Sequence, residues 1–408
     1  MNPKARFLNY ITIDTQSNPY TKTTPSTMGQ KELGKYLVNE LHDLGITNAY
    51  MDEFGYVYAF LSSNCASTQT IGLIAHMDTS FDASGKGICP QMISSYDGKD
   101  IVLSEKNKMI LSKKDFPSLN QKIGHELIVT NGETLLGADD KAGICIIISA
   151  IERILRENLP HPQLLLTFTP DEEIGEGTDH FNYSLYQKYN CDVAYTLDGG
   201  DIRYISFENF NAASCLFTIH GTSIHPGSAK GKMRNSMLIG MEIQSMLPVY
   251  QTPEVTENRE GFYHLTHMEG CVEQTTMAYI IRHHDQNAFM KQKELAIKIA
   301  EYLNEKYGAS TVDISIQDSY YNMREHILQR PEVLTYAIKA LKRNHIEPEF
   351  EAIRGGTDGA RLTFEGIYTP NLGTGGENFH GPYEYLDVTE MCQMIDVVIT
   401  LLQVVTEK

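Results

Sequence analysis

The sequence has few cysteines, and none of them forms a C-x-x-C motif. The seven cysteines among 408 residues are scattered, at positions 65, 89, 145, 191, 215, 271 and 392. Their odd number and irregular spacing argue against a disulfide framework and favour a reducing compartment. The first ten residues, MNPKARFLNY, lack the apolar run and cleavage site of a signal peptide. The most apolar stretch, Ile144 to Ile151, is shorter than a membrane span. We therefore expect a soluble, cytoplasmic protein.

Basic residues are also scarce relative to acidic ones. The sequence contains 34 Lys and Arg against 52 Asp and Glu, a formal net charge of −18. Such a surface repels phosphate backbones and anionic lipids, so neither nucleic acid nor membrane is an expected partner. With 41% hydrophobic and 21% charged residues the composition is that of a globular protein. At roughly 150 residues per domain, the length allows two or three domains.

Apolar runs alternate with helical patterns in the first half, which predicts an α/β fold with a largely parallel sheet. The expected strands are 69–75, 164–169 and 193–197, and the expected helices are 31–45 and 141–158. Turn residues are frequent in 81–135, so we predict hairpins and loops inserted between sheet strands there. The α/β pattern resumes near the C-terminus with a helix from 331, strands near 350 and 368, and a final helix from 387. Asp387 and Glu390 have the spacing of a capping box at that helix start.

The composition changes near residue 208, and a different pattern begins. The order is a strand (212–220), a helix (235–247), two strands (261–268 and 275–284), a long helix (287–307) and a last strand (311–317). This β-α-β-β-α-β order is that of a ferredoxin-like α+β domain. We therefore predict a catalytic domain in two parts, 1–208 and 317–408, with an inserted domain at 209–316.

Polar segments follow several of the predicted strands or precede the core helix. In open α/β sheets, ligands bind outside the carboxyl ends of the strands, so these segments should meet at one edge. Together they supply two histidines, His76 and His380, and several carboxylates, a donor set suited to zinc or a similar divalent ion. The segments are 75–79, 136–141, 170–173, 197–200 and 373–380.

Each of these residues has another interpretation when taken alone. His76 could be a core histidine that donates to a backbone carbonyl. Asp139 and Asp140 could simply cap the helix that follows, with no role in metal binding. The acidic run 171–173 could be a solvated turn. Asp78 favours the metal interpretation, because two residues along a strand it lies on the same side as His76 and can orient the imidazole.

Six motifs in series make the chain similar to a known enzyme family. It resembles the co-catalytic zinc exopeptidases of the aminoacylase and carboxypeptidase-like group and, within that group, the tripeptide aminopeptidases. The resemblance implies a zinc-exopeptidase-like catalytic domain with a mostly parallel central sheet, and an inserted lid and dimerisation domain. The motifs are AHMDTS at 75–80, LLGADDKAG at 135–143, TPDEEIG at 169–175, YTLDGG at 195–200, HPGSAKGKM at 225–233 and GGENFHG at 375–381.

The resemblance implies two zinc ions per subunit. One would be held by His76, Asp139 and Asp198, and the other by Asp139, Glu173 and His380. A carboxylate shared by two cations keeps them close enough to act on one water, whose pKa falls towards about 7.

The resemblance also implies that Glu172 is the general base and that Asp78 orients His76. Glu172, next to a ligand, can accept the proton of that water and pass it to the leaving amine. No G-x-S-x-G motif offers a serine nucleophile.

Three further residues, two in the inserted domain and one in the second part of the catalytic domain, resemble substrate-binding residues of the family. His225 matches a histidine that reaches the active site of the partner subunit in a homodimer. Arg282 and Arg354 match arginines that hold the C-terminal carboxylate of a short peptide, a role that suits a bidentate guanidinium. The alternatives are a surface histidine in a turn, a surface salt bridge for Arg282 and a helix-start arginine for Arg354.

Other functions remain open at this point. Within the same zinc group the alternatives are a dipeptidase, an N-acyl-amino-acid deacylase or a desuccinylase, which share the metal ligands. A catalytically inactive binding protein on this fold is a further alternative, although it would not need Glu172. A glycosidase with paired carboxylates would leave His76 and His380 without a role.

Overall fold

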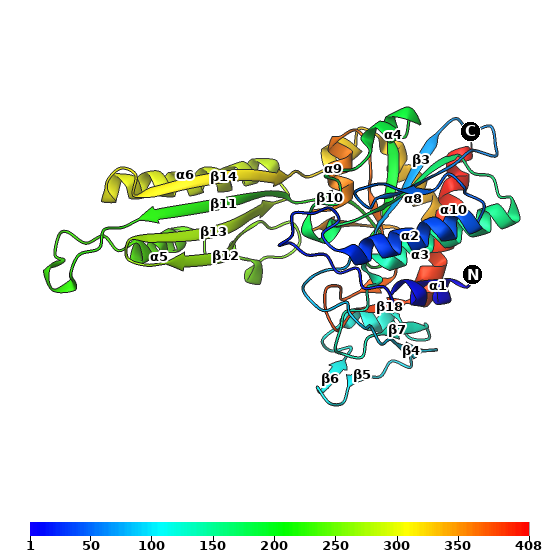
Figure 1. The fold of residues 1–408 in the computed structure, drawn as a ribbon, viewed down its shortest axis with the longest axis horizontal. Helices are drawn as coiled ribbons and strands as arrows, with labels where there is room; N and C mark the ends of the chain where they lie inside the picture. The colour runs from blue at the N-terminus through cyan, green and yellow to red at the C-terminus, as the bar shows by residue number, and fades with distance from the viewer. Residues whose placement is uncertain (408) are drawn as a thin grey trace. The chain divides into compact units, whose positions relative to one another are not determined.

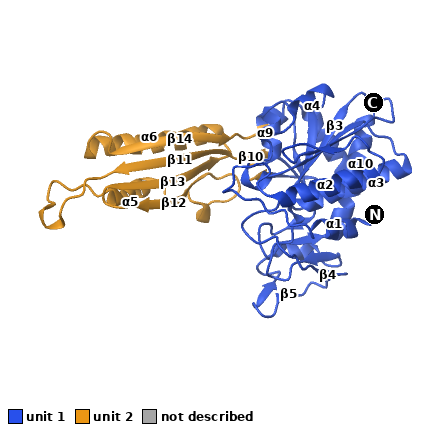
Figure 2. Ribbon diagram, in the orientation of Figure 1, with its two compact units in different colours: residues 1–207, 325–351, 357–408 blue, residues 208–324, 352–356 orange. Residues whose placement is uncertain are grey.

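The computed structural model describes residues 1–407 and divides into two compact units (Figure 2). Unit 1 comprises residues 1–207, 325–351 and the C-terminal stretch from 357. Unit 2 comprises residues 208–324 and 352–356. The domain limits 1–208, 209–316 and 317–408 stay a prediction.

Unit 1 is built on an eight-stranded sheet with the order β1-β2-β8-β3-β9-β16-β10-β15. Its central neighbours β8, β3, β9 and β16 pair in parallel, whereas β1, β2 and β10 pair antiparallel with their neighbours. The strands are β1 (Tyr50–Met51), β2 (Val57–Leu61), β3 (Thr70–His76), β8 (Gln163–Thr169), β9 (Val193–Leu197), β10 (Tyr204–Asn209), β15 (Glu349–Ile353) and β16 (Asn371–Leu372). The predicted α/β class with a mostly parallel central sheet is confirmed.

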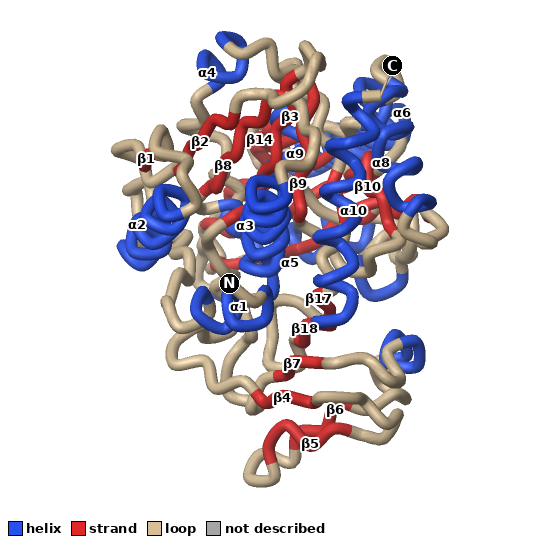
Figure 3. Tube along the Cα trace, turned by 90° about the vertical axis from the view of Figure 1, so that its right-hand side faces the viewer, coloured by secondary structure: helices blue, strands red, loops and turns tan. Residues whose placement is uncertain are grey.

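Helices cover both faces of this sheet, as the alternation of side chains along β9 illustrates. Tyr195 points to the face where α8 lies and donates a hydrogen bond of 2.6 Å from its hydroxyl to the Val333 carbonyl. Its neighbour Ala194 points the opposite way, into a cluster with Tyr186 of α4 and Leu362 of α9. The helices concerned are α3 (Ala138–Glu157), α4 (Tyr183–Lys188), α8 (Pro331–Arg343), α9 (Asp358–Phe364) and α10 (Val388–Thr406). Figure 3 shows α3 and α10 side by side.

Helix α10 is a long apolar element whose length was not predicted from the sequence. By length and composition alone it is the one helix among residues 1–407 that could cross a membrane. Most of its apolar side chains are buried, because α10 packs against α3 and α8. The helix begins as the capping box predicts: the Asp387 side chain accepts a 3.0 Å hydrogen bond from the Glu390 amide.

A second, small sheet in unit 1 joins the inserted 81–135 region to the C-terminal segment. Its order is β17-β18-β7-β4, and a separate hairpin β5-β6 lies beside it (Figure 3). Pairing of β18 with β7 carries residues 376–387 to the region of 127–129. The strands are β4 (Gln91–Ile93), β5 (Ile101–Ser104), β6 (Met109–Leu111), β7 (Leu127–Val129), β17 (Gly376–Glu377) and β18 (Tyr385–Asp387).

Two N-terminal helices complete unit 1. Helix α2 (Met28–Asp43) lies close to its predicted range, whereas α1 (Pro3–Tyr10) was not predicted. Arg6 of α1 is 1% exposed and its guanidinium donates to Glu40, Ser149 and Glu152. These bonds tie α1 to α2 and α3.

Unit 2 has the predicted ferredoxin-like arrangement (Figure 1). Its four strands form an antiparallel sheet in the order β12-β13-β11-β14. Alternate residues of β11, such as Cys215 and Phe217, point into one apolar core with Ile243 of α5 and Phe289 of α6. The elements are β11 (Asn211–His220), α5 (Ser236–Met246), β12 (Phe262–Gly270), β13 (Gln274–His283), α6 (Gln286–Tyr307) and β14 (Val312–Tyr320).

Candidate metal centre

Seven of the predicted site residues belong to unit 1, where they lie at or after the ends of strands or at the start of α3. His76 is the last residue of β3, and Glu172 and Glu173 lie in a short 3₁₀ helix (Glu172–Ile174) soon after β8. The other three predicted site residues belong to unit 2. The seven in unit 1 are His76, Asp78, Asp139, Glu172, Glu173, Asp198 and His380.

The Asp139 carboxylate lies between the two predicted histidine ligands. Its Oδ1 is 2.9 Å from Nε2 of His76, and its Oδ2 is 3.2 Å from Nε2 of His380. One carboxylate therefore offers one oxygen to each imidazole. This is the arrangement needed if a carboxylate is to be shared by two ions.

Two further carboxylates complete the cluster. Glu173 Oε2 is 2.9 Å from His380 Nε2, and Asp198 Oδ1 is 3.9 Å from His76 Nε2. Glu173 Oε1 is buried and has no hydrogen-bond partner among residues 1–407. A buried oxygen without a partner carries a desolvation cost that a bound cation would remove.

The neighbouring Asp140 is also close to His76 and Asp198, but its oxygens are already occupied. Oδ2 accepts from the His76 amide at 3.2 Å, and Oδ1 accepts from the Gly143 amide at 3.1 Å. The second bond caps α3, whose continuous helical geometry begins only after Asp140. The capping interpretation is therefore correct for Asp140, and Asp139 is left to face the imidazoles.

The donor set fits a divalent metal ion. It combines imidazole nitrogens with carboxylate oxygens, the ligands of zinc sites. A separate group consists of His125, Asp387 and Glu390. It differs because its carboxylates already have partners: Lys122 is 2.6 Å from Glu390, and His125 is 2.6 Å from Asp387. Among residues 1–407, the cluster around Asp139 is thus the better candidate for a metal centre.

Asp78 supports this cluster by a route that the sequence did not predict. Strand β3 ends at His76, so Asp78 does not lie on a strand beside it. Nδ1 of His76 is 3.0 Å from the Asp78 carbonyl and 3.4 Å from its carboxylate. That carboxylate is fully buried and accepts from the amides of Glu172 at 3.0 Å and Glu173 at 3.2 Å. Asp78 therefore links the histidine to the acidic turn.

The acidic turn is held from its other side by Asp171. This residue has a left-handed backbone, with φ of 57°. Its buried carboxylate accepts from the Ser26 amide at 2.7 Å and from Gln30 Nε2 at 2.7 Å. The run 171–173 is therefore not a solvated turn, because its first residue is anchored in the interior.

The ionisation of the cluster reflects burial and mutual charge. Burial alone would lower the pKa of His76, but hydrogen bonds to Asp139 and Asp78 raise it well above its ordinary value. Burial likewise opposes the charge of His380, yet its bonds to Asp139 and Glu173 raise its pKa to about 11. Without metal, the neighbouring carboxylates therefore favour the protonated form of both imidazoles.

Burial has the opposite consequence for the carboxyl groups. It raises the pKa of Glu173 to about 7, with help from the charge of Asp139, and the pKa of Asp198 to about 6. Burial and the charge of Asp198 also raise the pKa of Glu172 well above its usual range. The pKa of Asp139 is lowered instead, because its hydrogen bonds to the two histidines outweigh its burial.

In unit 2, the two predicted substrate-binding arginines lie next to each other. Nη1 of Arg282 donates to the Arg354 carbonyl at 3.2 Å, and the Arg354 guanidinium lies 5.2 Å from the ring centroid of Phe210. The Nε of Arg282 is buried without a partner, and no ion pair of Arg282 occurs among the described residues. Arg354 follows β15 and precedes α9 by several residues, so it is not a helix-start arginine.

His225 is exposed in unit 2 and caps a short 3₁₀ turn (Pro226–Ser228). Its Nδ1 accepts from the Gly227 amide at 3.2 Å, which leaves Nε2 free of a protein partner within the described chain.

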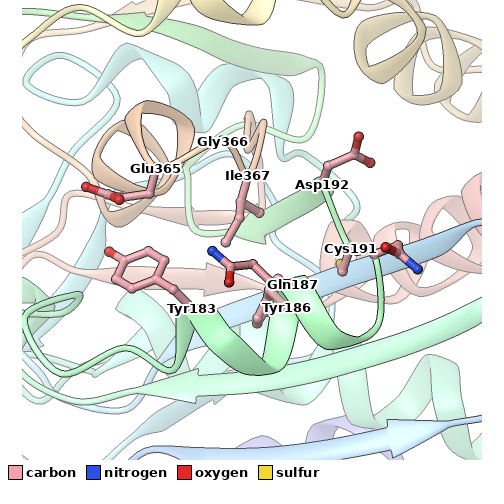
Figure 4. A pocket seen from close by; sticks show the side chains of 9 residues that line it. Tyr183, Tyr186, Gln187, Cys191, Asp192, Glu365, Gly366 and Ile367 are labelled. Carbon is pink, nitrogen blue, oxygen red and sulfur yellow. The ribbon is translucent and has the colours of Figure 1, made fainter.

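A pocket of about 380 Å³ lies elsewhere in unit 1 (Figure 4). Tyr183 and Gln187 of α4 form one side, and Glu365 after α9 forms another. None of the predicted ligands lines it, and its Asp192 already pairs with Arg330 at 2.7 Å. The cluster around Asp139, rather than this pocket, is therefore the candidate functional site.

Comparison with known proteins supports the same assignment. Residues 207–311 match the peptidase dimerisation domain family. Proteins named peptidase T from Caldanaerobacter subterraneus subsp. tengcongensis and Halothermothrix orenii are 50% and 47% identical to this chain. Each alignment covers 99% of this chain and 98% of the relative.

Solved structures share the fold at low sequence identity. An aminopeptidase from Bacillus cereus aligns with a TM-score of 0.77 and 21% identity, over 99% of this chain and 98% of its own. A tripeptidase from Staphylococcus aureus aligns with a TM-score of 0.80 and 19% identity, over 100% of this chain and 98% of its own.

An α/β unit with a His and Asp cluster at the strand ends, together with an inserted dimerisation domain, defines an M20 metallopeptidase. Within that class, the chain belongs to the peptidase T family.

The ionisation of the cluster predicts that metal binding releases protons. A coordinating imidazole must be deprotonated, and the carboxylates around His76 and His380 raise the pKa of both imidazoles in the metal-free protein. Protons and metal compete for the same nitrogen atoms, so affinity should rise with pH. We expect roughly two to three protons released per chain near pH 7, from the two imidazoles and in part from Glu173, whose pKa is about 7. Affinity should gain about tenfold per pH unit for each proton displaced.

Calorimetric titration of the metal-free protein in buffers of different ionisation enthalpy measures this proton count. The control is His225→Ala, which removes a histidine outside the cluster. It should release the same number of protons as wild type when metal binds. Metal affinity that is constant between about pH 6 and pH 8 would contradict the assignment of protonated imidazoles.

Proposed function

We propose that this protein is a dinuclear zinc aminopeptidase that removes the N-terminal residue from tripeptides. The observation that carries the proposal is the Asp139 carboxylate, which faces one imidazole with each of its oxygens. The family relationship supports the substrate class, because the relatives are named peptidase T and a structural neighbour is a tripeptidase. A cytoplasmic location is part of the proposal, because the seven scattered cysteines favour a reducing compartment.

In this proposal two zinc ions bind per subunit. His76, Asp139 and Asp198 hold the first, and Asp139, Glu173 and His380 hold the second. When bound, such a pair acidifies a water and polarises the substrate carbonyl. Support comes from the donor distances and from the unpartnered Glu173 Oε1.

Glu172 acts as the general base. It accepts a proton from the attacking water as the new C–O bond forms, and it then donates that proton to the leaving amine as the C–N bond breaks. Two features support this role: Glu172 adjoins Glu173, and its backbone is held by Asp78. Asp78 orients His76 through its carbonyl and fixes the base through its carboxylate.

Arg282 and Arg354 bind the C-terminal carboxylate of the peptide. The buried Arg282 Nε has no partner, and burial together with the charge of Arg282 lowers the pKa of Arg354. Two adjacent cations on an acidic protein favour a small anion such as a carboxylate. Substrates without a free C-terminal carboxylate should therefore bind poorly.

The dimerisation domain is present, and we propose that the protein is a homodimer in which His225 completes the partner's active site. His225 is exposed with a free Nε2, in a turn shaped by Pro226 and Gly227. There it would donate a hydrogen bond to the oxyanion that forms on the peptide carbonyl.

A substrate series with the zinc-loaded protein tests the proposed activity. Tripeptides should be cleaved in strong preference to dipeptides, tetrapeptides and N-acetylated tripeptides. Glu172→Gln should lower kcat on the best tripeptide by roughly 10²–10⁴-fold while keeping the metal, because only the base is removed. Preferred cleavage of N-acetylated substrates would instead favour a deacylase, and near-normal kcat of Glu172→Gln would remove that residue from the mechanism.

Subunit mixing tests the role of His225. His225→Ala should keep its metal and lose about 10²–10³-fold in kcat, the usual effect of removing one oxyanion donor. We expect that re-associating His225→Ala with Glu172→Gln restores activity. In the mixed dimer, the chain that keeps Glu172 receives an intact His225 from its partner.

The control mixes wild-type protein with the double variant His225→Ala/Glu172→Gln. If His225 acts on the partner's site, mixed dimers of this kind are inactive, because the wild-type site receives no histidine. Mixed dimers of the two single variants that stay inactive despite verified subunit exchange would refute the trans model.

A further inference from the structure

Glu384 is a buried carboxylate with no predicted role, and it binds the loop that carries Asp139. It is 1% exposed. Its Oε2 accepts from the amides of Leu136 at 2.6 Å and Gly137 at 2.9 Å, and its Oε1 accepts from the Asp139 amide at 3.1 Å. Three backbone donors of one short loop therefore converge on a single side chain.

The amides of Leu136, Gly137 and Asp139 cannot be paired by secondary structure, because they lie before or in the first turn of α3. Residues 136 and 137 precede the helix, and Gly137 has a left-handed backbone with φ of 77°. Buried amide groups must be paired, so this loop conformation depends on an acceptor from elsewhere. A carboxylate suits the task because its two oxygens accept at several positions and carry the charge that strengthens each bond.

The position of Glu384 in the chain couples it to the second imidazole. It lies four residues after His380, and its amide donates to the Gly381 carbonyl at 3.1 Å. The next residue, Tyr385, pairs with Val129 in the small sheet. One short segment, anchored in a sheet, thus supplies both a ligand and the acceptor for the loop of the shared carboxylate.

The bond to the Asp139 amide bears directly on the metal centre. The oxygens of Asp139 reach His76 and His380 at 2.9 and 3.2 Å, so a small shift of its backbone would misplace both contacts together. Glu384 itself makes no contact with either imidazole among the described hydrogen bonds. Its most direct link to the centre is therefore its bond to the Asp139 amide.

We propose that Glu384 is a positioning residue that sets the Asp139 carboxylate for two metal ions at once. This inference rests on the proposed dinuclear function. Glu384→Gln replaces one oxygen by an amide group whose hydrogens oppose a backbone N–H. Loss of an outer partner of a metal ligand usually costs about 10–100-fold in affinity, and here both ions should be affected because they share Asp139.

The matched control is Glu390→Gln. Glu390 is also a buried carboxylate, but it pairs with Lys122 and makes no contact with the Asp139 loop. It reproduces the loss of a buried charge without touching Asp139. Thermal unfolding with excess chelator compares the folds of the two variants in the absence of metal.

The test is a competitive zinc titration against a chromophoric chelator, together with the visible absorption of the cobalt-substituted protein. In Glu384→Gln we expect both zinc affinities to fall together by about 10–100-fold and the cobalt spectrum to change. In Glu390→Gln both should stay within about twofold of wild type. Glu384→Asp, which keeps the charge but shortens the side chain, should also weaken both ions, and it replaces Glu384→Gln if that variant does not fold.

Zinc affinities of a folded Glu384 variant that match those of wild type would overturn this inference, and so would the selective loss of one ion. If the wild-type protein itself fails to bind two ions, the proposed function fails instead. The two failures are therefore distinguishable in one set of titrations.

Discussion

The sharing of the Asp139 carboxylate between His76 and His380 is the interaction on which the functional site depends. His76 lies 63 positions and His380 lies 241 positions from Asp139 in the chain, and only the sheet topology brings the three residues together. Several buried carboxylates at one sheet edge are unfavourable in a protein of charge −18 unless positive charge is placed among them. In the metal-free protein the two imidazolium groups supply that charge, and bound cations would take their place.

Backbone amides hold the site in shape while the ligand atoms stay available. His76 donates its amide to Asp140, and the acidic turn donates two amides to Asp78. Each bond joins two segments that are distant in sequence, so the segments fix one another. Asp139 and Asp140 illustrate the division: two identical neighbours, of which one binds backbone amides and the other faces the imidazoles. Such pre-organisation limits the rearrangement that metal binding requires.

Much of the fold could be predicted because buried strands are continuous apolar runs. Strand β9 has the predicted bounds, and the ferredoxin-like arrangement of unit 2 agrees with the predicted order of its strands and helices. The sequence predicts that Asp78 orients His76, but it could not predict the bonds of Asp78 to the acidic turn. Strand β3 ends two residues before Asp78, and those bonds join segments distant in sequence. Glu384 carries no sequence signal of its own, because its partners are backbone N–H groups, which every residue except proline has. The roles of the metal ligands, Glu172, His225 and the two arginines stay predictions.

The most direct test of this account is a metal count by elemental analysis on active wild-type protein and on Asp139→Ala. If Asp139 is shared, wild type holds two zinc ions per chain and Asp139→Ala loses both, because each ion loses the same ligand. A folded His380→Ala should keep the ion held by His76. An active wild-type preparation with one zinc ion or none, or an Asp139→Ala variant that retains an ion at full affinity, would contradict the shared-carboxylate centre.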